Sequence, residues 1–198
     1  MDRFFSLIII FFFIGCDSGK QPIQGKTDWQ RDLNAMFKDA SRSPLSDSDR
    51  KSFKGLPFFP IDSNYIVKAD LKRTPDSPFF RMKTSTDDIN MERVYGILNF
   101  ELNGQAHQLE VYQGEEALNS MDNKDYLFLP FLDDTNAETT YGGGRYIDLR
   151  IPERDTIIID FNKAYNPYCA YNENYSCPIV PRKNYIETAV EAGVKLEN

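Results

Sequence analysis

The sequence predicts a mainly β fold, an antiparallel barrel or sandwich with an N-terminal amphipathic helix. From Tyr65 onward, apolar and polar residues alternate with a period of two in several short segments, which is the pattern of half-buried strands. These segments follow one another without helical patterns between them, and this order favours antiparallel pairing over a parallel sheet. The composition supplies a core, because 41% of the 198 residues are hydrophobic and 14% are aromatic.

The helix is predicted at the start of the folded part. Thr27-Asp28-Trp29-Gln30 has the form of a capping box, and apolar residues then recur at helical spacing. These apolar residues are Trp29, Leu33, Met36, Phe37 and Ala40. We therefore expect an amphipathic helix over residues 28–41, with its apolar stripe on the core. A second, shorter helix is expected after Ser46, where Ser and Asp residues are frequent.

The clearest pair of strands is a hairpin over residues 93–113. Its two alternating segments meet at Asn103-Gly104, and this dipeptide supplies the positive φ angles that a type I′ turn needs. The other predicted strands cover residues 65–72, 79–83, 126–131, 145–151, 156–161 and 185–190. We expect all of them in one β-rich domain over residues 27–198, since this length is typical of a single domain.

The N-terminus predicts export and a lipid anchor. Residues 4–14 form an uncharged apolar run that is too short to span a bilayer, which indicates a signal peptide over residues 1–15. The run ends in Phe13-Ile14-Gly15-Cys16, which resembles the lipobox of bacterial lipoproteins, whose cysteine is diacylated and becomes the first mature residue. An ordinary cleaved signal beside an incidental cysteine is the alternative. Residues 16–26 are polar, contain Gly and Pro, and are expected to form a tether.

These features place the domain outside the cytoplasm, held at the cell membrane or the outer membrane by lipidated Cys16. The formal net charge of the chain is -7. A protein that binds nucleic acid or anionic lipid through its surface needs a basic face, so the charge argues against such partners.

Two dense polar and aromatic segments stand out in the last third of the chain. Residues 128–146 contain FLPFLDDT and TYGGGRY, and residues 159–178 contain DFNKAYNPYC and YSCP. Together these motifs resemble the family of bacterial proteins known as domain of unknown function 1684 (DUF1684), over residues 45–195. Two positions depart from the family pattern, with Val180 in place of Pro and Val194 in place of Glu. The resemblance implies no activity, so the chemistry must come from the residues.

The triple glycine before Arg145 has two interpretations. Glycines at 142–144 permit a tight connection between strands, because glycine adopts backbone angles that other residues avoid. Alternatively, the backbone amides around Gly143 approach a bound anion or carboxylate while Arg145 closes a bidentate clamp. No Gly-Lys-Ser/Thr follows these glycines, so a Walker-type phosphate loop is not supported.

Several acidic residues are candidates for hard oxygen ligands or acid-base groups. A hydrolase with Asp133 and Asp160 as its acid-base pair or metal ligands is one hypothesis. The alternative is that these aspartates form turns through bonds to their own backbone. If Arg145 is buried, it is expected to pair with one of these carboxylates, since an unpaired interior charge is costly. In that case an ion pair between the two dense segments explains both features.

Cys169 and Cys177 are the two cysteines left after Cys16. An even pair in an exported chain predicts a disulfide, with a free nucleophilic thiol or half of a metal site as the alternatives. His107 is the one histidine of the chain and cannot build the multi-histidine zinc sites of common hydrolases. We expect no metal and no cofactor.

A cluster of tyrosines and asparagines follows Asp160 and combines flat apolar surface with hydrogen-bonding groups. Its members are Tyr165, Tyr168, Tyr171, Tyr175, Asn162, Asn166, Asn172 and Asn174. Such mixtures bind sugars and small polar ligands in concave sites. The alternative is an aromatic loop that the disulfide holds over the end of the sheet.

The central hypothesis is that the triple-glycine turn and the Asp160-Phe161-Asn162 segment face a common hollow. The candidate ligand-binding residues are Arg145, Asp133, Asp160, Asn162, Tyr165, Asn166, Tyr141 and Gly143. The sequence thus predicts a lipid-anchored protein that binds a small polar or anionic ligand or a component of the cell envelope. A carboxylate- or metal-dependent hydrolase is the first alternative, and a purely structural envelope lipoprotein is the second.

Overall fold

The structure is a computed structural model of the chain and describes residues 25–196. The predicted signal peptide, Cys16 and most of the tether lie outside the described residues. Within residues 25–196, none of the helices has the length and apolar character needed to cross a membrane.

One sheet organises the described chain. Its main path runs in the order β6-β5-β4-β3-β1-β7, with β2 added beside β3 and β8 beside β5. The strands are β1 (Ile66–Arg73), β2 (Phe80–Lys83), β3 (Ile89–Leu102), β4 (Gln105–Gly114), β5 (Tyr126–Asp133), β6 (Arg145–Arg150), β7 (Thr156–Asp160) and β8 (Tyr185–Ile186). Every pairing is antiparallel except the short parallel contact of β5 with β8. The predicted mainly β, antiparallel fold is confirmed.

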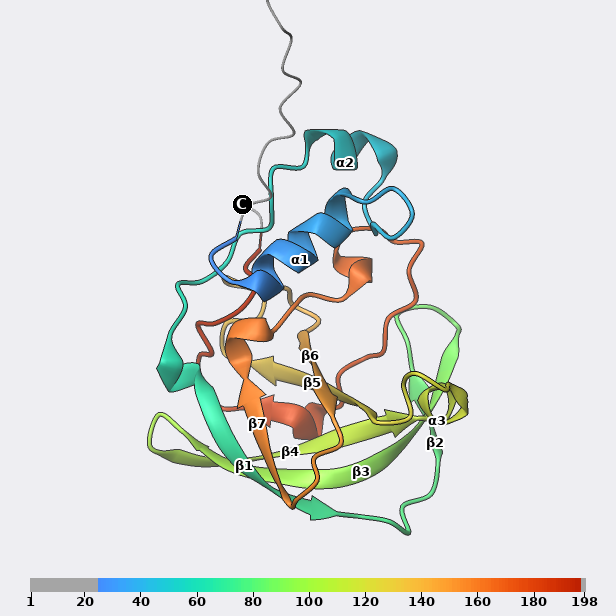
Figure 1. The fold of residues 1–198 in the computed structure, drawn as a ribbon, viewed down its shortest axis with the longest axis vertical. Coiled ribbons are helices and arrows are strands. Elements are labelled where there is room, and N and C mark those ends of the chain that lie inside the picture. Colours follow the sequence, from blue (N-terminus) through green and yellow to red (C-terminus); the bar gives the residue numbers. More distant parts are fainter. Residues whose placement is uncertain (1–24, 197–198) are drawn as a thin grey trace, which may run out of the picture.

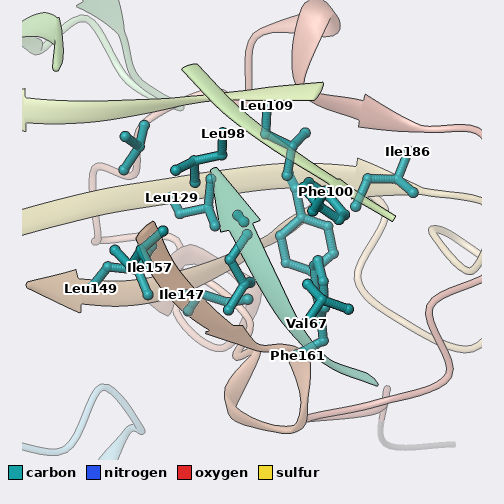
Figure 2. Close-up of a cluster of buried hydrophobic side chains, with 14 of the residues drawn as sticks. Val67, Leu98, Phe100, Leu109, Leu129, Ile147, Leu149, Ile157, Phe161 and Ile186 are labelled. Atoms are coloured by element: carbon teal, nitrogen blue, oxygen red, sulfur yellow. The ribbon is translucent and has the colours of Figure 1, made fainter. Parts of the chain in front are cut away.

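The sheet curls into a half-barrel around one apolar core (Figure 1). Side chains from all six strands of the main path meet inside the curl, and Figure 2 shows them pointing toward one another. Leu98, Leu109, Leu129 and Ile159 are fully buried there. Tyr146 at the start of β6 and Tyr165 after β7 exchange two backbone hydrogen bonds, of 2.9 and 3.0 Å, which bring the two ends of the sheet together.

The hairpin of β3 and β4 turns at the predicted dipeptide. Asn103 and Gly104 both have positive φ angles, 53° and 75°, as a type I′ turn requires. Farther from the turn, the register of β3 against β4 shifts between Val94 and Gly96, which marks a β-bulge. The bulge changes which face the side chains occupy. Leu98 lies in the core inside the curl, whereas Val94 packs into a second cluster on the outer face of the sheet.

Two helices lie at one end of the sheet (Figure 1). Helix α1 (Asp28–Lys38) begins at Thr27, whose side chain accepts a hydrogen bond from the Gln30 amide, and Phe37 packs into a third apolar cluster with Val194. The helix ends before the predicted residue 41, because Asp39 leaves helical geometry and its carboxylate accepts from the Ser41 amide. Helix α2 (Asp47–Ser52) follows its cap at Ser46 as expected.

Short elements complete the chain. Helix α3 (Glu115–Asn119) was not expected from the sequence, and four short 3-10 turns join it: η1 (Ser63–Tyr65), η2 (Phe161–Lys163), η3 (Tyr168–Ala170) and η4 (Arg182–Asn184). The strand predicted over residues 185–190 is only two residues long. It stops because the Thr188 amide bonds back to the Ile186 carbonyl, at 2.7 Å, and the Val190 amide bonds to the Asp133 side chain instead of a neighbouring strand.

A buried ion pair fastens the C-terminal segment to the sheet. Arg145 is 0% exposed, and its Nη2 lies 2.8 Å from Asp133 Oδ2 and 2.8 Å from the Val190 carbonyl. Its Nη1 donates to the Ala192 carbonyl, and its guanidinium lies 5.1 Å from the centre of the Phe131 ring. The second oxygen of Asp133 accepts from the amides of Thr135 and Val190. Burial lowers the pKa of Arg145, and the Asp133 charge opposes that shift.

Replacement of Arg145 by Met is expected to destabilise the domain strongly. The substitution leaves the Asp133 carboxylate buried without its cation, a change that costs about 3–5 kcal/mol. Arg150→Met is the matched control, because Arg150 lies on the same strand in an exposed pair with Asp125 and is expected to cost less than about 1 kcal/mol. Urea unfolding of the two variants measures both values, and equal losses would contradict a latch at Arg145.

Candidate functional site

Asp133 and two backbone carbonyls occupy both terminal nitrogens of Arg145, and its buried Nε has no partner within residues 25–196. Arg145 is sealed beneath the C-terminal segment and pairs with Asp133, which lies in the same dense segment, so this ion pair does not join the two dense segments. Within residues 25–196, no hydrogen bond or ion pair joins Arg145 to Asp160. The two side chains therefore have separate partners, and no bond between them within the described chain supports the common hollow predicted from the sequence.

Asp160 and Asn162 hold a local turn at the end of β7. Asp160 caps η2 by accepting a hydrogen bond from the Asn162 amide at 3.1 Å, and its other oxygen lies 3.7 Å from Lys163 Nζ. Asn162 is buried and bonds to both the amide and the carbonyl of Asp62, at 3.0 and 2.9 Å. Both side chains thus have structural partners that account for their positions.

The triple glycine is a tight entry to β6. Gly144 has a φ of 90°, and a Cβ atom there would lie 2.7 Å from the Phe131 carbonyl oxygen, so only glycine fits. A Cβ on Gly143 would meet the Tyr141 ring at 2.5 Å. The Tyr141 hydroxyl lies 4.0 Å from Cys169 Sγ. The side-chain amide of Asn166 donates a hydrogen bond to the Tyr171 hydroxyl at 3.2 Å.

The predicted disulfide between Cys169 and Cys177 is wrong. Both are free thiols, and the Cys177 sulfur accepts a hydrogen bond from the Cys169 amide at 3.1 Å. The loop needs no covalent closure because backbone bonds fix it to the end of β2, from Ser85 to Cys177 and from Ile179 to Lys83. Burial raises the pKa of the Cys177 thiol to about 12, so this sulfur is not a thiolate nucleophile at neutral pH.

A cavity with a volume of about 730 Å³ lies on the outer face of the sheet. We call it the Glu92 pocket. Its lining includes Glu92 of β3, Phe128 of β5 and Asp148 of β6, together with α3 and parts of residues 165–178. This volume lies in the range of sites that bind small molecules.

Glu92 is the unusual residue of this pocket. It is 7% exposed, and its buried Oε2 atom has no hydrogen-bond partner among residues 25–196. Gly114, its partner across the β3–β4 ladder, leaves room for the carboxylate, because a Cβ atom there would lie 3.0 Å from Glu92 Oε1. Burial, and then the nearby Glu116 charge, raise the pKa of Glu92 to about 7.

A second carboxylate in the pocket is held by tyrosines. The hydroxyls of Tyr126 and Tyr165 donate to Asp148 Oδ1 at 2.8 and 2.7 Å. Burial, followed by the Asp148 charge, raises the pKa of both phenols, so they remain neutral donors at physiological pH. Tyr168 and Tyr146 add further aromatic surface to the lining. The arrangement therefore offers carboxylate acceptors between flat aromatic walls.

Of the candidate ligand-binding residues predicted from the sequence, Tyr165 lines this pocket. Cys177, predicted in another role, lines it as well, whereas Glu92, Tyr126 and Asp148 were missed. A signal for the pocket existed in residues 127–131, an apolar run without alternation, which is typical of a strand covered on both faces. Glu92 had no such signal, because the bulge that turns it outward is not visible in the pattern.

No trio of His, Cys, Asp or Glu side chains within the described part of the chain is arranged to hold a metal ion. Val194, where the family pattern has Glu, is fully buried beside Phe37, Phe53 and Leu56 and donates its amide to the Ala164 carbonyl. It lies outside the Glu92 pocket.

Comparison with known proteins agrees with the resemblance seen in the sequence. The family described as proteins of unknown function, DUF1684, matches residues 51–195. The solution NMR structure of an uncharacterized protein from Haloarcula marismortui is similar to this chain, with a TM-score of 0.65 and 34% identity over 85% of this chain and 95% of the other. No curated protein matches the chain. The chain therefore belongs to the family of domain of unknown function 1684.

Proposed function

We propose that the protein is a lipid-anchored binding protein that holds a small polar ligand in the Glu92 pocket. The observation that carries the proposal is the buried carboxylate of Glu92, which lines an open cavity and leaves one oxygen without a partner. Buried acids in native proteins are normally paired, since an unpaired charge in the interior is costly. Acids with strongly shifted pKa values in clefts are typical of functional sites.

The aromatic lining supports a polar organic ligand. Tyr126, Tyr165 and Tyr168 present flat apolar rings whose hydroxyls donate or accept hydrogen bonds, a combination that suits ligands with both apolar and polar edges. The lining is acidic rather than basic, which disfavours the anionic ligand considered from the sequence. The small polar ligand is therefore the part of that hypothesis that we retain.

The anchor is proposed from the sequence of residues 1–26. Lipidation of Cys16 would attach the chain to a membrane without a transmembrane helix, since each buried methylene of an acyl chain contributes about 0.8 kcal/mol. The tether of residues 16–26 would reach roughly 35–40 Å when fully extended. The domain would then sample solutes close to the membrane surface outside the cytoplasm.

A hydrolase is the second candidate function, and one observation favours it. Glu92, with its pKa raised to about 7, is suited to act as a general acid or base at neutral pH, and Asp148 supplies a second carboxylate in the same cavity. This pair replaces Asp133 and Asp160 of the sequence-based hypothesis, whose side chains are engaged in the ion pair and in the η2 cap.

Glu92→Gln is expected to stabilise the domain at neutral and alkaline pH. The pKa of Glu92 is raised from 4.5 to about 7 in the folded state, so Glu92 stays protonated to a higher pH in the folded protein than in the unfolded chain. The free energy of unfolding therefore falls as pH rises between these two values. The fall attributable to this group is on the order of 3 kcal/mol. Urea unfolding between pH 4 and 8 measures it. Glu101→Gln, an exposed change on the same strand, serves as the control, and identical profiles for both variants would refute the shift.

A cavity-filling substitution tests binding in the pocket. Ser120 lines the cavity and Asn119 beside it is exposed outside it, so Ser120→Trp is expected to block ligands while Asn119→Trp is not. The measurement is a set of ¹H–¹⁵N spectra recorded with neutral sugars, polyols, amino acids, carboxylic acids and amines as probes. At least one class should shift pocket resonances in the wild type and the control alone. A chain that responds to none of these probes would be better described as a structural protein.

Lipidation is tested by metabolic labelling with an alkyne analogue of palmitate in a bacterial host. The wild type is expected to incorporate the label, and Cys16→Ser is expected to lose it, because the acyl chains are attached through that cysteine. Cys177→Ser is the matched control and should label normally, since this residue is a buried thiol of the folded domain. Absence of label in the wild type would leave an ordinary cleaved signal as the account of residues 1–16.

A further inference from the structure

The charged groups of the Glu92 pocket are unbalanced. The lining holds three carboxylates, Glu92 from β3, Glu116 from α3 and Asp148 from β6, and one cation, Arg150. The guanidinium of Arg150 is already engaged, with Nη1 2.8 Å from Asp125 Oδ1. A ligand that enters the pocket therefore meets excess negative charge, which repels phosphate, sulfate and carboxylate groups.

The carboxylates of Glu92 and Asp148 each keep an oxygen that can accept a further hydrogen bond. An ionised carboxylate only accepts hydrogen bonds, and Oε2 of Glu92 has no donor within the described residues. Asp148 receives both of its tyrosine hydrogen bonds at Oδ1, and no hydrogen bond reaches its Oδ2 in the described chain. A ligand group that satisfies these oxygens must be a donor or carry positive charge.

The aromatic walls suit the same kind of group. The ring centroids of Phe128 and Tyr146 lie 4.7 Å apart in an edge-to-face arrangement. The rings of Tyr146 and Tyr165 have the same arrangement, with their centroids 5.9 Å apart. Rings at such angles present faces in more than one direction, and the negative face of an aromatic ring attracts ammonium cations. The phenols lining the pocket remain neutral, so their rings keep this character.

We infer that the ligand of the Glu92 pocket presents an alkylammonium group, which binds between the aromatic rings with Glu92 and Asp148 as its counter-charges. This inference rests on the proposed function and narrows it to one chemical class. The ammonium belongs either to a free amine or to the headgroup of a lipid, whose phosphate would have to stay outside the acidic lining, and both sources share the recognition of the ammonium itself.

The inference predicts a particular pH dependence. The groups that face Glu92 are Glu116 from α3, Tyr112 from β4 and Tyr126 from β5, and the neighbouring residues of β2 that share its face, Phe80 and Met82, carry no charge. Both phenols are neutral, so the carboxylate of Glu92 is the group that ionises near pH 7. Because an ammonium ligand favours the ionised carboxylate, its affinity should rise between pH 6 and pH 8.

The test compares cations with uncharged molecules of the same shape. Choline is paired with 3,3-dimethyl-1-butanol, and ethanolamine with 1-propanol, in calorimetric titrations of the full chain in a polyoxyethylene detergent without sugar or charge. We expect at least one cation to bind about tenfold or more tightly than its uncharged counterpart. Glu92→Gln should weaken that cation about tenfold and remove the pH dependence, whereas Glu101→Gln should change neither.

The outcomes separate the inference from the proposed function. If neutral sugars or polyols bind in the pocket and the cations bind no better than their counterparts, the inference is overturned and the binding function stands. If no probe binds to the wild type, both are overturned. Loss of choline binding in Glu92→Gln, with unfolding at least as cooperative as in the wild type, supports the inference. Glycerophosphocholine identifies the source, since tighter binding than choline indicates a lipid headgroup and weaker binding indicates a free amine.

Discussion

The curled sheet must bury side chains on both of its faces, and the rest of the structure follows from this constraint. Inside the curl, strands from both ends of the sheet share one aliphatic core. On the outer face, Tyr112, Phe128 and Tyr146 form a second cluster that water would otherwise reach. Residues 176–180 and helix α3 lie over this outer face and cover it only in part. The cavity is the part of the outer face that they leave open.

The two buried charged side chains Arg145 and Glu92 differ in how completely their surroundings compensate the charge. Arg145 has Asp133, two carbonyls and an aromatic ring around it, so its charge is compensated within the described chain, although its Nε has no hydrogen-bond partner there. Glu92 is nearly as buried but has an acidic neighbour and an unpartnered oxygen. A buried charge with fixed partners is compensated within the fold, whereas a buried charge without them lowers the stability of the fold.

Patterns that depend on local chemistry were predictable from the sequence. The Asn103-Gly104 turn, the caps at Thr27 and Ser46, and most strands appear where their residues indicated, because these features depend on a few neighbours along the chain. The short β8 strand and the site were not predictable in the same way. Each depends on partners distant in sequence, such as the bond from the Val190 amide to Asp133. Arg145 was a candidate anion ligand because it follows three glycines in the sequence. Its structural role, the ion pair with Asp133 and the bonds to the C-terminal carbonyls, depends on its burial in the fold.

The bulge near Tyr95 divides one long strand into two halves with opposite alternation. On the hairpin side, even-numbered residues such as Leu98 and Phe100 belong to the core, and on the other side even-numbered residues such as Glu92 and Val94 belong to the outer face. The pocket end of the strand can therefore change its side chains without disturbing the packing of the hairpin. A single insertion or deletion at this point would exchange the two faces of residues 89–94, sending Arg93 toward the cavity and Glu92 toward hydrocarbon. The charge that the strand presents to the cavity thus depends on one extra residue of backbone.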